Sequence, residues 1–202
     1  MKIRQVLFGF GGIVFLIGVL VTSSSMVMAQ DEIYEGSTIT GTMIAFSSRG
    51  RVGSRSETFR LIISNYTSRD EVARLNDILG SGQDKLLDAI SKLSAGRIEI
   101  GSGVGVPANV IFAEPAANGE TKITVVYERR LGFSELRYGT RSSDYRFGYA
   151  EMYIRRNGAG QGTLIPAAKI RLRGDNTWEV EDFGIYPARL MGLRVRGGLA
   201  PR

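Results

Sequence analysis

The chain of 202 residues contains no cysteine and no histidine, and each absence excludes a class of chemistry. Without cysteine there are no disulfides, no thiolate nucleophile and no lipid-modified cysteine, which excludes small disulfide-stabilised scaffolds. Without histidine there is no Ser-His-Asp or Cys-His catalysis, and the usual ligands of zinc, copper and haem are missing. We therefore expect no metal and no cofactor, and we favour a protein that is not an enzyme.

Two further catalytic patterns are also absent. No serine stands three positions before a lysine, and no Gly-x-Ser-x-Gly turn occurs. The glycine-rich stretch 101–107 lacks the Gly-Lys-Ser/Thr of a phosphate-binding loop, so we interpret it as a turn. Hydrolysis by a pair of carboxylates needs none of these groups and stays possible. As an alternative hypothesis, Glu135, Asp144 and Glu151 are the acids of a hydrolase acting on envelope glycans.

The charge of the chain is weakly positive. Lysine and arginine together number 26 against 20 acidic residues, which gives a formal net charge of +6. This balance favours an anionic partner, although a scattered solvated surface gives the same composition. The sharpest cationic candidate is the loop SSRGRVGSRS, where Arg49, Arg51 and Arg55 are predicted to contact an anion. The loop carries no aromatic residue, which disfavours recognition of single-stranded nucleic acid.

The amino-terminal residues have the pattern of an export signal. Lys2 and Arg4 precede an apolar run over 6–21, and small residues lead to Ala29, after which we expect cleavage. An uncleaved membrane anchor is the alternative. The expected product is periplasmic or extracellular, so an anionic envelope component or another envelope protein is the expected partner. We expect a short acidic leader over 30–36, one domain over 37–195 and a basic tail over 196–202.

Hydrophobic periodicity predicts strands over most of the chain and one pair of helices. Ser68 to Glu71 forms a capping box that opens a helix ending at Gly80, and a second helix runs to about 95. Strands are predicted over 37–46, 58–66, 97–100, 104–114, 122–129, 144–156, 162–173, 177–183 and 185–195. The predicted fold is α+β and mainly antiparallel, with about eight strands in a curled sheet or partial barrel and one inserted helical hairpin. A two-sheet β-sandwich is the alternative.

The stretch RYGTRSSDYRFGY at 137–149 concentrates arginine and aromatic side chains. From 144 onward it reads as a strand with aromatic residues on one face and small or aliphatic residues on the other, which predicts a central strand covered on both sides. A ligand site is expected where loop and strand meet, at Arg137, Tyr138, Arg141, Asp144 and Arg146. The favoured hypothesis is an exported domain that binds a ligand or an envelope partner through a sheet face. A self-assembling structural subunit is a further alternative.

Overall fold

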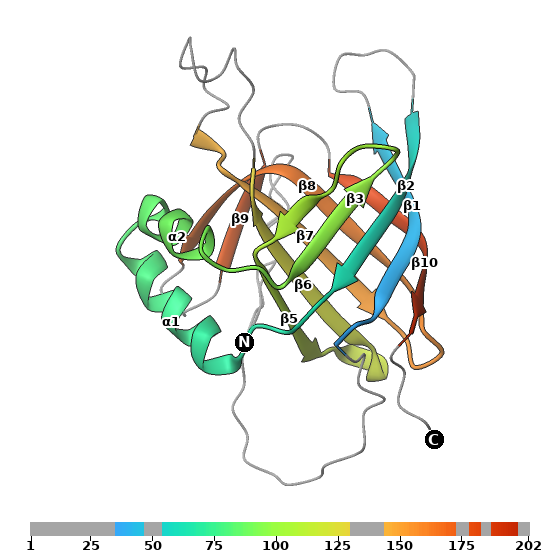
Figure 1. Ribbon diagram of the computed structural model, residues 1–202, viewed down its shortest axis with the longest axis horizontal. Coiled ribbons are helices and arrows are strands. Elements are labelled where there is room, and N and C mark those ends of the chain that lie inside the picture. Colours follow the sequence, from blue (N-terminus) through green and yellow to red (C-terminus); the bar gives the residue numbers. More distant parts are fainter. Residues whose placement is uncertain (1–34, 47–53, 130–143, 173–177, 183–186, 198–202) are drawn as a thin grey trace, which may run out of the picture.

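The computed structural model describes residues 35–46, 54–129, 144–172, 178–182 and 187–197, and its chain path is drawn in Figure 1. Within these ranges, ten strands, two α-helices and a short 3-10 helix at Ala117–Gly119 form an α+β domain with one antiparallel sheet, as predicted, rather than two sheets packed as a sandwich. The elements are β1 Thr38–Phe46, β2 Ser54–Ile63, α1 Arg69–Gly80, α2 Gln83–Ile90, β3 Gly96–Ile100, β4 Val106–Ala108, β5 Val110–Pro115, β6 Thr121–Glu128, β7 Phe147–Ile154, β8 Ala159–Leu172, β9 Trp178–Asp182 and β10 Ala188–Arg196. Neither helix in the described ranges has the length and apolar character that a bilayer span requires.

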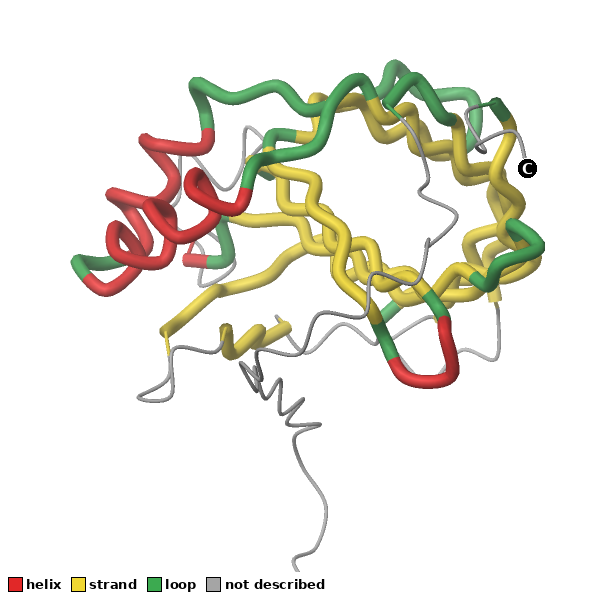
Figure 2. The backbone as a smooth tube through the Cα atoms, turned by 90° about the horizontal axis from the view of Figure 1, so that it is seen from below, coloured by secondary structure: helices red, strands yellow, loops and turns green. Residues whose placement is uncertain are grey.

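The sheet curls until it nearly closes, as the view along it shows (Figure 2). The strand order is β4-β3-β2-β1-β10-β8-β7-β6-β5, and β9 pairs with the far end of β8. The first and last strands of this order, β4 and β5, are consecutive in the chain. They are separated only by Asn109, where the sequence alone predicted one unbroken strand. The buried Asn109 side chain donates to the Leu93 carbonyl at 2.9 Å and accepts from the Glu128 amide at 2.8 Å, which holds the bend.

One hydrophobic core fills the interior of the curled sheet. Alternate residues of every strand except β9 point inward, because successive side chains of a strand face opposite ways. The interior is filled by large apolar side chains, among them Phe59, Leu61, Ile123, Met152 and Leu193. Tyr127 lies across from Gly148 in the strand register, and its ring occupies the space a Cβ atom at Gly148 would need. The inside of the sheet is therefore packed with protein side chains.

A second core lies outside the sheet, beneath the two helices. The two helices lie against the outside of the sheet (Figure 1). Their apolar stripes meet outward residues of β5, β6 and β7, residues of β9 and the far end of β8. Leu75, Leu86 and Ile90 from the helices pack with Phe147 and Tyr149 from β7. On β7 the inward Met152 and Ile154 are buried as well. The prediction that this strand is central and covered on both faces is confirmed.

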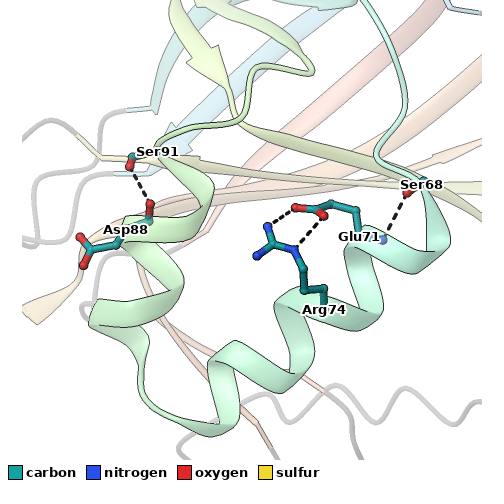
Figure 3. A network of polar contacts seen from close by, with 5 residues as sticks. All are labelled: Ser68, Glu71, Arg74, Asp88 and Ser91. Atoms are coloured by element: carbon teal, nitrogen blue, oxygen red, sulfur yellow. Dashed lines mark hydrogen bonds and ion pairs between the residues drawn. The ribbon is translucent and has the colours of Figure 1, made fainter.

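Local signals explain where the helices begin. The Ser68 hydroxyl accepts the Glu71 amide at 3.2 Å and caps α1, as the capping box predicts (Figure 3). The Glu71 carboxylate does not return to the cap, as a full box would require, but pairs with Arg74 one turn later. Gly82, with a φ of 119°, turns the chain into α2 and has no side chain to cap it.

Candidate functional site

The predicted ligand site lies only partly within the described residues. Arg137, Tyr138 and Arg141 fall outside them, and Asp144 and Arg146 stand just before β7. The Asp144 side chain is exposed, and its carbonyl accepts from the Gln83 side chain at 3.4 Å. Arg146 is half-buried, and its carbonyl accepts the Arg129 amide at 2.8 Å. The described contacts of these two residues attach the start of β7 to α2 and β6, and the site itself stays a prediction.

Tyr145, between those two residues, has a structural role. Its hydroxyl donates to the Glu181 carboxylate of β9 at 2.6 Å, and Arg171 of β8 pairs with the same carboxylate at 3.3 Å. The Tyr145 carbonyl accepts from the Arg129 guanidinium at 2.7 Å. These bonds connect β9, β8 and β6 to the strand entry. Part of the arginine and aromatic cluster in the sequence therefore serves packing.

The three acids of the hydrolase hypothesis have different surroundings. Glu135 lies outside the described residues, Asp144 is exposed, and Glu151 is only 7% exposed. The Glu151 carboxylate accepts the Tyr149 hydroxyl at 2.8 Å and the Tyr153 hydroxyl at 2.6 Å. Burial, together with these bonds to Glu151, raises the pKa of both tyrosines above its ordinary range. Glu151 thus accepts hydrogen bonds from two neutral phenols within a packed layer.

An ion pair between a nearly buried lysine and a partly exposed glutamate continues this polar layer on the outer face of the sheet. Lys122 of β6 is nearly buried and lies 3.1 Å from Glu114 of β5. In the strand register Lys122 is also opposite Tyr153. Glu151 and Lys122 therefore find their polar partners inside the protein, as buried charged groups generally do.

The predicted anion-contact loop is described only at its end. Arg49 and Arg51 lie outside the described residues, and β2 begins at Ser54, so Arg55 belongs to the strand rather than to the loop as predicted. The Arg55 guanidinium lies 2.7 Å from the Glu57 carboxylate, with 82% of the arginine side chain exposed. The charge of Arg55 is therefore partly neutralised by its neighbour.

The outward residues of β1, β2 and β10 form a cationic surface that the sequence did not single out. We call it the arginine–threonine face: Thr38, Thr40, Thr42, Thr58, Arg60, Arg189, Arg194 and Arg196. Across the strands, Thr38 pairs with Arg196, and Thr40 lies between Arg60 and Arg194. Arg60 pairs with Glu99 at 3.1 Å. For Arg194 and Arg196, no carboxylate of the described chain lies within ion-pair distance.

A bulge at Gly192 creates this face. Ala188 and Leu190 point inward, and so do Leu193 and Val195, so the inward pattern changes parity between them. The register of β10 against β8 shifts between Leu190 and Leu193, and Gly192 has a φ of 59°. If β10 instead alternated regularly through Gly192, Arg194 and Arg196 would point into the apolar interior, because a one-residue slip exchanges the two faces of a strand.

A shallow hollow opens at one end of the same face. It is lined by Thr42, Ser56, Glu57, Thr58, Gly101 and Ser102. Thr42 and Thr58 are directly opposite each other on β1 and β2, and Met191 of β10 lies on the other side of Thr42. Met191 is 44% exposed. The hollow is therefore lined by four residues with hydroxyl groups and by Glu57, beside an exposed thioether side chain. The Thr58 hydroxyl donates to the Gly101 carbonyl at 3.4 Å.

Comparison of the chain with protein-family models, with curated proteins and with solved structures finds no match.

Proposed function

We propose that this protein is a non-enzymatic binding domain that holds an anionic partner on its arginine–threonine face. The observation that carries the proposal is the outward side of β10. Three arginines stand there on one strand, and Arg194 and Arg196 have no carboxylate partner in the described ranges. A guanidinium presents several N–H donors in a planar fork, which matches carboxylate, phosphate and sulfate groups.

The position of these arginines supports binding. β10 lies inside the sheet order, between β1 and β8, so its backbone is bonded on both sides. Sites on such regular elements keep their geometry better than sites on loops. The threonine hydroxyls of β1 lie between the arginines of β2 and β10 and can donate or accept hydrogen bonds to the same partner.

The other hypotheses have weaker support. Self-assembly through sheet edges would need a long open edge, whereas this sheet nearly closes on itself. The outer side of β9 is an edge, but β9 carries Glu179 and Glu181, and exposed charges discourage strand pairing. Glycan hydrolysis would need an accessible pair of acids, whereas Glu151 is buried and bonded to two tyrosines.

The proposal also includes export. The amino-terminal residues predicted as a signal lie outside the described ranges, so this part rests on the sequence. Export would bring the arginine–threonine face among the anionic polymers and headgroups of a cell envelope.

The test compares two variants that each lose two positive charges. Arg194→Gln with Arg196→Gln removes the two unpaired arginines of the face. Arg74→Gln with Arg155→Gln removes two exposed, paired arginines elsewhere. Binding of polygalacturonate and of polyphosphate to the purified protein is measured by titration calorimetry. The first variant is expected to lose at least tenfold in affinity, because a hydrogen bond to a charged group contributes roughly 1.5–3 kcal/mol.

The control variant is expected to lose much less, since only net charge changes there. Binding of the unaltered protein should also weaken as salt is raised, because exposed charges are screened. Equal losses in the two variants would show that net charge alone acts and would overturn the assignment to this face. Absence of binding to both polyanions would overturn the proposed function.

A further inference from the structure

We infer that the anionic partner is an acidic polysaccharide, with one sugar ring seated in the hollow beside the arginines. This inference rests on the proposed function and names the ligand class of the same face. The observation behind it is the contrast between the two parts of the surface. The arginines offer positive charge, whereas the hollow offers hydroxyls and a carboxylate.

The lining of the hollow suits sugar hydroxyls better than a densely charged anion. Thr42, Ser56, Thr58 and Ser102 each have a hydroxyl that can donate and accept. The Glu57 carboxylate can only accept, so it takes hydrogen bonds from a ligand hydroxyl, and its pairing with Arg55 reduces its repulsion of an acidic ring. A sugar ring carries donors and acceptors around its edge, which this mixture satisfies.

Met191 completes the arrangement. It is exposed on β10 directly opposite Thr42, at the border of the hollow. The faces of a sugar ring carry C–H groups, and a flexible thioether side chain adapts its contacts to such a surface. Apolar contact and convergent polar groups together are the usual composition of a small-molecule site.

Glycine at position 101 keeps the carboxylate in the wall of the hollow. Gly101 has a φ of 62°, and a Cβ atom built on it would lie 2.7 Å from the Glu57 carboxylate oxygen. The Gly101 amide also donates to the Thr58 carbonyl at 2.8 Å, which fixes the turn beside the strand. A side chain at 101 would therefore move Glu57 and disturb the backbone at the same time.

The distance between the hollow and the arginines suits a polymer. Thr40 and Thr42 are two residues apart on β1, so the row that contains Arg60 and Arg194 is about 7 Å from the row that contains Thr42 and Thr58. One sugar ring in the hollow would place a neighbouring acidic ring over the arginines. Charge and ring recognition are then supplied by adjacent parts of one ligand.

The experiment measures binding of polygalacturonate, dextran and polyphosphate by titration calorimetry to the purified protein. The hollow variant is Thr42→Val with Thr58→Val, which keeps β-branched side chains and removes two hydroxyls. Its control is Thr121→Val, a half-buried threonine of β6 outside the arginine–threonine face. Circular dichroism and thermal unfolding establish that each variant is folded. If the double variant does not fold, Glu57→Gln and Thr58→Val are measured singly.

The hollow variants are expected to lose at least fivefold in affinity for polygalacturonate and less than twofold for polyphosphate, while Thr121→Val changes neither by twofold. Dextran is expected to bind at least tenfold more weakly than polygalacturonate. If the hollow variants bind polygalacturonate unchanged while the arginine variant loses affinity for it, this inference fails and the proposed function stands. If no polyanion binds the unaltered protein, the proposed function fails first. Equal binding of dextran and polygalacturonate would overturn both.

Discussion

The curled sheet has two sides that differ in what covers them. The side built from β5, β6 and β7 is packed on its inner face by the interior core, and the helical hairpin covers one end of its outer face, at Val110, Val126 and Phe147. The side built from β1, β2 and β10 is packed only within, and its outer face carries threonine and arginine. The sequences reflect this, since β7 is apolar on both faces whereas β10 places arginines on its outer face.

This difference indicates where the molecule can bind something else. On the covered side, polar groups such as Glu151 and Lys122 have partners inside the protein, so their hydrogen-bonding capacity is used for stability. On the open side, Arg194 and Arg196 have no such partner in the described chain. A ligand there would add hydrogen bonds without breaking existing ones.

The sharpest test of the comparison removes one large apolar side chain from each side. Phe147 is completely buried beneath the helices, whereas Met191 is 44% exposed on the open face. Phe147→Ala is expected to lower the free energy of unfolding by about 3–5 kcal/mol, because it leaves a cavity. Met191→Ala is expected to change it by about 0.5 kcal/mol or less. Urea denaturation measures both, and equal losses would show that the open side is covered as well.

Alkaline pH is expected to act on the covered side. Burial raises the pKa of Tyr127 to about 12, and burial also raises the pKa of Tyr149 and Tyr153. A raised pKa favours the neutral phenol in the folded state. The stability that the neutral phenols contribute is therefore complete below pH 10 and is lost as pH rises through 12. For Tyr127, the free energy of unfolding is expected to fall by roughly 3 kcal/mol, at 1.36 kcal/mol for each pKa unit.

The measurement is urea denaturation between pH 8 and 12 for the unaltered protein and for Tyr127→Phe. The variant should lose less stability between pH 10 and 12, since phenylalanine has no proton to release. The values at pH 8 serve as the reference, because the phenols are neutral there. An identical pH dependence for the two proteins would contradict the assignment of Tyr127 to a buried neutral state.

The covered side could be predicted from the sequence, because its signals are local. The apolar spacing of 75, 79, 86 and 90 and the cap at Ser68 gave the helices, and the two apolar faces from 147 to 154 gave a central strand. The bend at Asn109 was missed, because its cause is a pair of hydrogen bonds to Leu93 and Glu128 that are distant in sequence.

The arginine–threonine face could not be recognised by simple alternation. Along β10, Leu190 and Leu193 are both inward although they are three residues apart, and only a bulge reconciles them with a strand. The isolated glycine between them, Gly192, was the available signal. The sequence pattern predicts a tail that begins at residue 196, whereas Arg196 is the last residue of β10. The face also needs β1 and β10, which are far apart in the chain, to be neighbours.

A smaller effect is expected from a change that presses on this bulge. Gly41 of β1 faces it, and a Cβ atom there would lie 2.8 Å from the Met191 carbonyl and 2.7 Å from the Leu193 side chain. Gly41→Ala is therefore expected to lower the free energy of unfolding by about 1–3 kcal/mol, as overpacking does. It should also weaken polyanion binding, because the bulge sets the direction of Arg194 and Arg196.

Gly103→Ala is the matched control, since its Cβ atom would have only one neighbour, at 3.4 Å. It should lower the free energy of unfolding by about 0.5 kcal/mol or less. Urea denaturation and calorimetry on both variants decide the point. Loss of stability with unchanged binding would separate the bulge from the binding face, whereas loss of both would connect the open side's function to a single inserted residue.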